Sequence, residues 1–410
     1  MLTLKQHIRL NKKQYKILLD YAHYSNNLYN VCVYNAKLHF KETNKYISLK
    51  ELMNLAQLNE NYKLLPSQTS QQIVRLVDKN FRSFFALLRK KKLGQYNDNI
   101  KEPNFKIKGG LFNIIFCYQN AYLKKDKIYF CKSKKYKEIN PNKLEIDFSY
   151  KLDGKIKQIM FQPKNKGQYF IMYINYEENK NKIKKGEINY ENYLSIDLGV
   201  NNLAACFDNA SGHSFILNGK PLKSYNRWYN KTKAKIQSEL ELKNKRKWSK
   251  KLQNLSQKRS NFIDNYFNQY ISYLMKYCLN NKIGNIVIGY NKEWKQNLNL
   301  GKINNQKFMY ISYNVFKQKL ENKCKNNGVN FILTEESYSS KCSAIDFEKL
   351  GKHENYLGQR IKRGLFKSAK RILINADING SINILRKIIN DNKINITKNT
   401  LNTNVISNVI

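Results

Sequence analysis

Acidic residues are scarce in this chain of 410 residues, with 30 Asp and Glu against 74 Lys and Arg. The formal net charge of +44 is self-repelling and needs a polyanion to neutralise it. The charge therefore predicts a nucleic-acid partner. Lys is more common than Arg in this chain. Its ammonium group suits contact with backbone phosphate as a point charge more than it suits the recognition of nucleobases. The aromatic content of 13% supplies surfaces on which unpaired bases stack.

Long apolar runs and paired cysteines are also missing. No stretch approaches the ~18 consecutive apolar residues of a membrane span, so we expect no contact with membranes. Residues 1–7 show no apolar core behind a basic end, and we expect no signal peptide. The seven cysteines are scattered without a CxxC pair, which predicts reduced, mostly buried thiols in a cytoplasmic protein.

Two distant segments each carry an aspartate in a setting suited to a metal ion. Residues 194–202 (Leu-Ser-Ile-Asp-Leu-Gly-Val-Asn-Asn) predict a β-hairpin whose first strand ends on Asp197. Asp377 stands just before a helical pattern at 378–385. A carboxylate at a strand end needs a cation or hydrogen-bond donors, and Mg²⁺ is a suitable cation. The alternatives are that Asp197 caps the hairpin and Asp377 the helix.

The pattern of the first 190 residues changes from helical to strand-like. Residues 2–10 alternate as a strand, and helical patterns follow at 12–40, 49–60 and 67–92. A charged linker follows the strand-like region, at 179–185. Between helices and linker, short alternating runs predict a β-rich domain with strands at 105–108, 113–118, 127–130, 144–147, 156–161 and 168–176.

From residue 192 the expected elements follow the order βββαβαβα, which is typical of an RNase H fold. Two strands of the hairpin precede a third at 213–217 and a long basic helical stretch at 226–278. A buried strand at 285–289, a helix through Phe316 and Leu320 and a strand at 331–334 complete the order. The chain is thus expected to be an α+β multidomain protein with an RNase H-like (RuvC) nuclease domain.

Four motifs together resemble the TnpB (OrfB) proteins of bacterial insertion sequences, which are relatives of type V CRISPR effectors. They are 194–202, 338–342 (Tyr-Ser-Ser-Lys-Cys), 375–386 and, more weakly, 103–106 (Pro-Asn-Phe-Lys). The resemblance implies an RNA-guided, Mg²⁺-dependent DNA endonuclease of a transposable element, with two Mg²⁺ ions in a RuvC-like site. Its partners would be a guide RNA from the transposon end and double-stranded target DNA. It would be a bacterial cytoplasmic protein that acts at the nucleoid.

The resemblance also implies a division into domains. The expected parts are a first strand of a wedge β-barrel (1–10), a helical recognition lobe (11–100), the rest of the wedge barrel (101–190), a RuvC-like nuclease domain (191–341 and 371–390), a degenerate zinc-finger-like insert (342–370) and a disordered tail (391–410).

One catalytic acid of the family is missing from its usual place. The family carries Glu at the end of the fourth strand, where this chain has Gly289. The next strand ends in Glu335 and Glu336, and a Glu there can span the ~5 Å between neighbouring strands. Because successive strand residues face opposite sides, only one of the two is expected in the site, and we favour Glu336. Glu293 is a weaker candidate, and a surface turn is the alternative for Glu335 and Glu336.

The expected catalytic acids are therefore Asp197, Glu336 or Glu335, and Asp377, of which Asp197, Glu336 and Asp377 would hold the Mg²⁺ ions. Relatives usually carry two CxxC pairs after the last strand, but here Cys342 has no partner and His353 cannot complete a site. We therefore expect no zinc, and expect the basic insert to contact DNA or to pack as a hairpin. The expected nucleic-acid-binding residues are Lys90, Lys91, Lys106, Lys245, Arg246, Lys247, Lys250, Lys251, Arg259, Lys341 and Arg363.

The sequence leaves two other functions open. Because Gly289 lacks a carboxylate, one alternative is a nuclease-dead, RNA-guided DNA-binding protein that acts as a repressor or accessory factor. A transposase proper, which joins strands itself without RNA, is the other alternative, since RNase H-like folds also host that chemistry.

Overall fold

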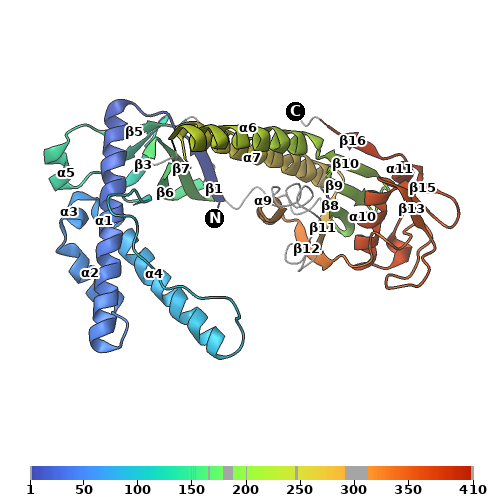
Figure 1. Ribbon diagram of the computed structural model, residues 1–410, viewed down its shortest axis with the longest axis horizontal. Coiled ribbons are helices and arrows are strands. Elements are labelled where there is room, and N and C mark those ends of the chain that lie inside the picture. The colour runs from blue at the N-terminus through green and yellow to red at the C-terminus, as the bar shows by residue number, and fades with distance from the viewer. Residues whose placement is uncertain are drawn as a thin grey trace. The chain divides into compact units, whose positions relative to one another are not determined.

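The computed structural model describes residues 2–148, 150, 152, 154–164, 167–178, 188–199, 201–244, 248–290 and 313–407. The chain divides into two units, Met1–Lys182 and Ile183–Ile410 (Figure 1). The expected linker at 179–185, Glu293, and the basic residues Lys245, Arg246 and Lys247 lie outside the described residues. The finer domain boundaries stay predictions. No helix of the described residues is both long and apolar enough to cross a membrane.

The helices of the first unit that begin at Lys12 and Leu49 start where the sequence supplies side-chain caps. The side chain of Asn11 accepts from the backbone amide of Gln14, and the side chain of Gln14 accepts from the backbone amide of Asn11. Ser48 and Glu51 form the same capping box. These caps satisfy amide groups that have no partner inside the helix. The helices are α1 (Lys12–Thr43), α2 (Leu49–Gln57), α3 (Glu60–Leu64), α4 (Ser67–Lys92) and the unexpected α5 (Lys134–Ile139).

Strands of the first unit form two sheets, with orders β1-β7-β6-β2 and β3-β4-β5. The first strand pairs antiparallel with β7, as the family resemblance implies. The closed wedge barrel stays a prediction, because the strands divide between two sheets. The strands are β1 (Leu2–His7), β2 (Ile114–Cys117), β3 (Ala121–Lys124), β4 (Lys127–Phe130), β5 (Leu144–Asp147), β6 (Gly154–Lys164) and β7 (Tyr169–Glu178).

The strand expected at 105–108 is wrong. Its backbone bonds to side chains of α1 instead of to another strand: the Lys106 amide donates to Asn30 Oδ1 over 2.7 Å. The amide groups of Asn30 and Asn26 donate in return to the carbonyls of Lys106 and Ile107. Since these side chains satisfy the backbone, the alternating pattern does not need a partner strand here.

The second unit is built on a six-stranded sheet of order β12-β11-β8-β9-β10-β16. The first three strands along the chain pair antiparallel, and β11 and β12 continue the sheet in parallel from β8. This is the RNase H-like arrangement that the sequence predicts. The strands are β8 (Asn189–Leu198), β9 (Asn202–Asp208), β10 (Ser214–Asn218), β11 (Ile283–Tyr290), β12 (Asn330–Glu335) and β16 (Asn404–Ile406).

Helices cover both faces of this sheet, as Figure 1 shows within the second unit. Alternation along β11 sends Ile286 and Ile288 into one core with α7 and α9, while Val287 joins the other core with Ile378 and Ile382 of α10. The helical stretch expected at 226–278 is divided into two helices. The helices are α6 (Lys220–Asn244), α7 (Lys250–Asn280), α9 (Tyr313–Asn327) and α10 (Ala376–Arg386).

The expectation of a disordered tail is wrong for residues 391–407. This segment forms a 3₁₀ helix (Asp391–Lys393), α11 (Lys398–Leu401) and β16, which pairs parallel with the edge strand β10. The hydroxyl of Tyr270 donates to the Ile406 carbonyl over 3.0 Å. An edge strand presents unpaired backbone groups, and the apolar-polar alternation of the tail suits it to cover that edge. Residues 408–410 lie outside the described residues.

Candidate active site

Asp197 lies on the face of the sheet that α10 covers. It follows Ser195 by two residues in β8, so both side chains point to the same face. The hydroxyl of Ser195 lies 3.0 Å from the hydroxyl of Ser381 in α10. Oδ2 of Asp197 lies 2.6 Å from the point that a Cβ at Gly380 would occupy. The glycine therefore lets the helix approach the carboxylate closely.

Glu336 occupies the space left by the missing acid at Gly289. Ile288 pairs with Ile196 and Gly289 pairs with Thr334, so Gly289 lies in the row between the ends of β8 and β12. A Cβ at Gly289 would lie 2.8 Å from Oε2 of Glu336 and 3.2 Å from its Cβ. The same Cβ would lie 2.6 Å from Ile384 of α10. Glycine at 289 is thus the residue that makes room for the side chain of Glu336.

Glu335 points elsewhere, as the alternation of strand residues predicts. Its side chain is 61% exposed and forms an ion pair with Lys387 at 3.0 Å. Its other oxygen accepts from the backbone amide of Ser337 over 2.8 Å. These bonds lower the pKa of Glu335, with the Ser337 hydroxyl as the largest cause. Glu335 therefore holds the turn after β12, and Glu336 is the acid directed toward Gly289.

Asp377 lies in the first turn of α10, directly after the short strand β15 (Leu373–Asn375). Asn375 caps the helix by accepting from the amides of Asp377 and Ile378. Two side chains reach the Asp377 carboxylate: Asn202 donates to Oδ2 over 2.6 Å, and Arg360 Nη2 lies 3.4 Å from Oδ1. The Asp377 carboxylate is therefore oriented from the hairpin on one side and from the insert on the other.

The three carboxylates affect one another electrostatically. Burial raises the pKa of Asp197 well above its usual value, and the charges of Asp377 and Glu336 raise it further, while Arg360 opposes them. Burial likewise raises the pKa of Glu336, ahead of the charge on Glu335. No group of three or more His, Cys, Asp or Glu in the described part of the chain is already arranged to hold a metal ion. Asp197, Glu336 and Asp377 thus lie near one another but do not form a complete set of metal ligands. Their metal-binding role stays a prediction.

The donor set suits a hard divalent cation. Partly buried acids that repel one another need a positive charge, and carboxylate oxygens are the ligands that Mg²⁺ prefers. None of the hydrogen bonds found among the described residues involves the carboxylate of Asp197, although that group is only partly accessible. Such a carboxylate is free to bind an ion. Asp197, Glu336 and Asp377 therefore fit the group that the family resemblance implies.

We expect Asp197→Asn to stabilise the metal-free protein. A carboxyl whose pKa is raised in the folded state stabilises the fold at low pH and loses that contribution as pH rises through the raised value. The amide removes both the buried charge and its repulsion with Asp377 and Glu336. Thermal melts in EDTA, from about pH 5 to about pH 8, should show the variant melting a few degrees above the wild type, with the gap widening as pH rises.

Mg²⁺ provides the control for this prediction. The ion should raise the Tm of the wild type, because it binds only the folded state, and should raise that of Asp197→Asn much less. Equal Tm values for the two proteins across the pH range would contradict the raised pKa. An equal response to Mg²⁺ would show that the ion binds elsewhere.

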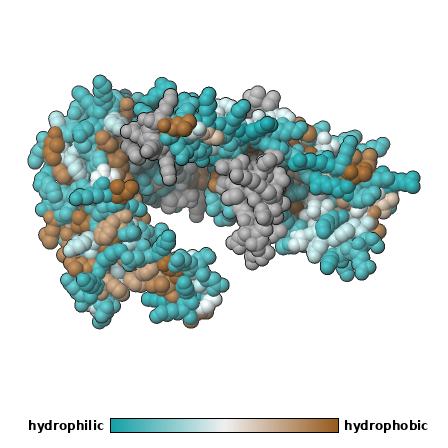
Figure 2. Space-filling view, viewed as in Figure 1, coloured by the Kyte–Doolittle hydropathy of each residue, from teal (hydrophilic) through white to brown (hydrophobic). Residues whose placement is uncertain are grey.

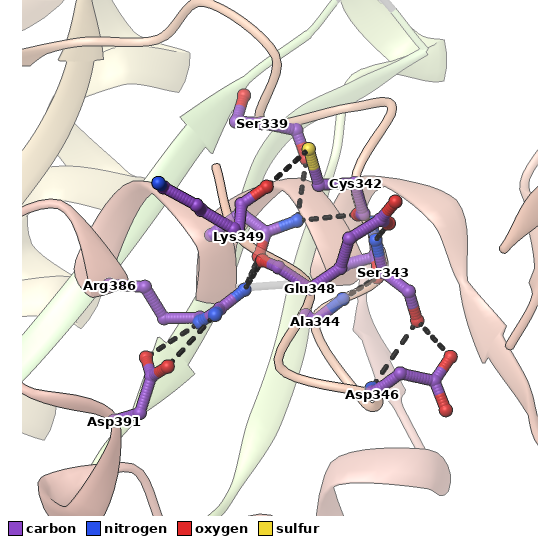
Figure 3. Close-up of polar contacts among 11 residues, drawn as sticks. Ser339, Cys342, Ser343, Ala344, Asp346, Glu348, Lys349, Arg386 and Asp391 are labelled. Atoms are coloured by element: carbon purple, nitrogen blue, oxygen red, sulfur yellow. Dashed lines mark hydrogen bonds and ion pairs between the residues drawn. The ribbon is translucent and has the colours of Figure 1, made fainter. Parts of the chain in front are cut away.

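The insert after β12 is held together by hydrogen bonds from buried polar side chains. Figure 3 shows Arg386 of α10 directed at Asp391 on one side and at the Glu348 carbonyl on the other, with donor distances of 2.7 to 2.9 Å. The buried carboxylate of Glu348 accepts from the backbone amides of Ser343 and Leu357. Cys342 is buried, with its thiol 3.6 Å from the Lys349 carbonyl. These contacts hold the loop in place by hydrogen bonds.

The same insert contributes to the site on α10. The basic hairpin that the sequence predicts is present as β13 (Gln359–Lys362) and β14 (Leu365–Lys367), and β14 pairs with β15 next to Asp377. This pairing brings Arg360 to the Asp377 carboxylate. Asn383 of α10 donates to the carbonyl of Ser339, and Ser339 in turn bonds the carbonyl of Glu336. The turn that carries Glu336 is thereby attached to the helix that carries Asp377.

The expected nucleic-acid-binding residues differ in what they contact. Lys90, Lys91, Lys250, Lys251, Lys341 and Arg363 are exposed, which suits contact with phosphate. Lys106 lies over the rings of Tyr29 and Phe112 at 5.0 and 5.2 Å. Arg259 is half-buried, donates to Asn226 over 2.7 Å and lies over the Tyr229 ring. Arg259 therefore fastens α7 to α6, and its expected contact with nucleic acid stays a prediction.

The sequence does not single out three residues of this site. Asn202 is predicted only as part of a turn, although an Asn in an acidic hairpin motif is a signal for a carboxylate partner. Gly380 is one of several small residues expected to let the helix approach the sheet, but the sequence does not show that Asp197 is the group approached. Arg360 had no distinguishing signal among the basic residues of the insert, because the pairing of β14 with β15 brings it to Asp377.

Comparisons with known proteins agree with this arrangement. A family model described as a probable transposase, OrfB_IS605, matches residues 174–295, and the Cas12f1-like TNB domain matches residues 313–384. No curated protein sequence matches the chain. These two matches confirm the resemblance that the motifs indicate.

Solved structures show the fold. The chain is similar to Cas12f1 in a complex with sgRNA and target DNA, at 16% identity and a TM-score of 0.60, over 92% of this chain and 83% of that chain. It is also similar to the mini RNA-guided endonuclease CRISPR-Cas_phi3, at 11% identity and a TM-score of 0.50, over 94% of this chain and 92% of that one. At these identities the likeness establishes the α+β multidomain fold and says nothing of activity.

Proposed function

We propose, from the premise that this chain is a TnpB-like relative of the type V effectors, that it is an RNA-guided, Mg²⁺-dependent DNA endonuclease of a transposable element. The observation that supports this most directly is the convergence of Asp197, Glu336 and Asp377 on one face of an RNase H-like sheet. The two similar structures are an RNA- and DNA-bound Cas12f1 and an RNA-guided endonuclease. By analogy, the partners here are a guide RNA from the transposon end and double-stranded target DNA.

Asp197, Glu336 and Asp377 are the residues proposed to bind two Mg²⁺ ions. When bound, the ions activate a water and stabilise the leaving oxygen of a phosphodiester. Asn202 is a positioning residue, because its bond to Oδ2 leaves Oδ1 of Asp377 facing the basic side of the site. Arg360 offsets the charge of the acids and stands where the anionic backbone of a substrate approaches.

The exposed lysines and arginines are proposed to hold nucleic acid by its backbone. In RNA-guided proteins base pairing reads the sequence, and the protein recognises the shape and charge of the duplex. Lys250 and Lys251 on α7 and Lys341 and Arg363 around the insert are exposed on the unit that carries the acids. Their excess over nearby acids favours phosphate contact and predicts binding that weakens with salt.

A nuclease-dead DNA-binding protein is the second candidate. Gly289 lacks the usual carboxylate, and Arg360 contacts Asp377 in the place where a metal would compete. This candidate predicts RNA-guided binding without cleavage. A transposase proper remains the third, and it predicts strand transfer without RNA.

Plasmid cleavage tests the proposal directly. The chain would be purified with its co-expressed flanking RNA and incubated with a plasmid that carries the matching target. We expect cleavage in Mg²⁺, none in EDTA, and loss by roughly 100-fold or more in Asp377→Asn, because the substitution removes a ligand but keeps the shape.

Three outcomes separate the candidates. If the wild-type and variant complexes both bind the target and neither cleaves it, the nuclease-dead protein is favoured. Strand transfer by protein freed of RNA would favour the transposase. Cleavage that survives in EDTA or in Asp377→Asn would overturn the metal site.

A further inference from the structure

The first unit contains an open cleft that the proposed nuclease site does not use. It has a volume of about 540 Å³ and lies between the end of α1 and the last turns of α4. Pockets of this size commonly bind small molecules or parts of larger ones. The residues that give it its chemistry are Phe40, Tyr46, Arg82, Phe85, Arg89 and Lys92.

Aromatic rings form the wall of this cleft. The Phe40 and Phe85 rings are 5.9 Å apart, and Tyr46 lies 5.5 Å from Phe85. Tyr46 and Phe85 also pack against the core of the unit, while Phe40 is 43% exposed. Hydrophobic surface is visible among hydrophilic residues over α2 and α4 of this unit (Figure 2). An aromatic ring left this open is a surface on which a flat group can stack.

Cations form the rim. Arg89 and Lys92 are exposed and line the cleft, and they lie on one side of α4 because they are three positions apart. Arg82 also lines it and is bonded to Asp78 over 2.8 Å. No acidic residue is among the lining residues. Basic residues at a helix end favour the helix dipole, but that effect does not explain why two of the four line a cleft that contains the exposed ring of Phe40.

We propose that this cleft binds an unpaired nucleotide of RNA. The base would stack against Phe40 beside Phe85, and the phosphates on either side would contact Arg89 and Lys92. Aromatic rings beside a positive groove are the usual means of binding single strands. RNA is the favoured source because folded RNA presents splayed-out bases in loops and bulges. The inference rests on the RNA binding of the proposed function and adds a site in the other unit.

Phe40→Ala tests the stacking contact. The probes are a fluorescent single-stranded oligouridine and a fully paired RNA duplex, and the readout is the Kd by anisotropy with the full chain. We expect about 10-fold weaker binding of the single strand and little change for the duplex. Tyr34→Ala is the matched control, because Tyr34 is 56% exposed on the same helix and does not line the cleft.

The basic run at the end of α4 offers a second matched pair. The double variant Arg89→Gln with Lys92→Gln removes the two charges at the cleft, and Lys90→Gln with Lys91→Gln removes two beside it. For single strands, the logarithm of the binding constant falls with the logarithm of the salt concentration by about 0.7 for each phosphate contact. Losing two contacts should therefore reduce the magnitude of this slope by about 1.4. We expect this loss in the first pair and a clearly smaller one in the second.

Several results would overturn the inference. Equal effects of the two charge pairs, together with no effect of Phe40→Ala, would indicate general electrostatic attraction. A dimer in solution that Phe40→Ala dissociates would show that a second copy covers the cleft. Phe40→Leu keeps an apolar side chain at this position but removes the aromatic ring. If stacking is the contact, this variant must bind the single strand as weakly as Phe40→Ala does, and single-strand binding at the wild-type level would contradict the stacking contact. Plasmid cleavage by the Phe40→Ala complex at saturating RNA should persist, so failure here is distinct from failure of the nuclease proposal.

Discussion

Glu336→Gln is expected to reduce plasmid cleavage by roughly 100-fold or more, and Glu335→Gln to leave it near the wild-type rate. The amide keeps the shape of the side chain but is a poor ligand for Mg²⁺. Glu336 lies over Gly289, where the family that the motifs resemble usually has its second acid. Glu335 is exposed and bonded to Lys387. Cleavage rates of the two complexes, measured at several Mg²⁺ concentrations, distinguish the roles.

The two adjacent glutamates control for each other. Both variants change one charge in the same turn, so a general loss of negative charge would affect them equally. Glu335→Gln should lower the Tm slightly, since it breaks the contact with Lys387. If Glu335→Gln abolishes cleavage and Glu336→Gln does not, the third acid is Glu335. If neither variant matters, the site does not use an acid from this strand.

Gly380→Ala is expected to lose cleavage while the fold stays intact or becomes more stable. The new Cβ would lie 2.6 Å from Oδ2 of Asp197. Apart from the adjacent residues and the helix's own backbone, atoms of Asp197 are the only ones among the described residues within 4 Å of it. That oxygen is the end of a side chain, so the carboxylate moves aside at little cost to the fold. Ala also favours a helix over Gly by about 1 kcal/mol. A displacement of about 1 Å in a catalytic group costs roughly 100-fold in rate.

Gly351→Ala is the matched control, because nothing lies within 4 Å of the Cβ it would add. Cleavage rate and Tm should be measured for both variants. Gly380→Ala should fall in rate without falling in Tm, and Gly351→Ala should change neither. A Gly380→Ala complex that cleaves normally would show that the position of Asp197 does not matter. A large drop in Tm would mean that the helix, not the carboxylate, moved.

The nuclease fold was predictable because its elements carry strong local patterns. The buried run at 283–290 and the hairpin at 194–208 have the length and composition of strands, and their order along the chain matches one topology. Weak patterns failed. The alternating residues at 105–108 bond to Asn26 and Asn30 of α1, which no local rule foresees. The tail has no acid after Asp391 and no long apolar run, yet it is ordered where it adds β16 to an open edge of the sheet.

The sequence identifies the candidate acids, whose catalytic role stays a prediction, but it does not identify their other neighbours in the site. Asp197 and Asp377 stand in recognisable motifs, and the alternation along a strand favours Glu336 over Glu335. Arg360 belongs to a set of similar basic residues, and only the pairing of β14 with β15 selects it. The cleft in the first unit has no motif, because Phe40 and Arg89 are far apart in the chain.

The sequence alone determined the charge that calls for a polyanion, the order of strands and helices, and the acids available for a metal. These depend on composition and on periodicities within single elements, which are local properties. The tertiary structure decided which side chains meet: Glu336 over Gly289, Gly380 against Asp197, and Arg360 and Asn202 at Asp377. Such meetings depend on the register between strands and the approach of α10 to the sheet, and these are set by packing between segments distant in the chain.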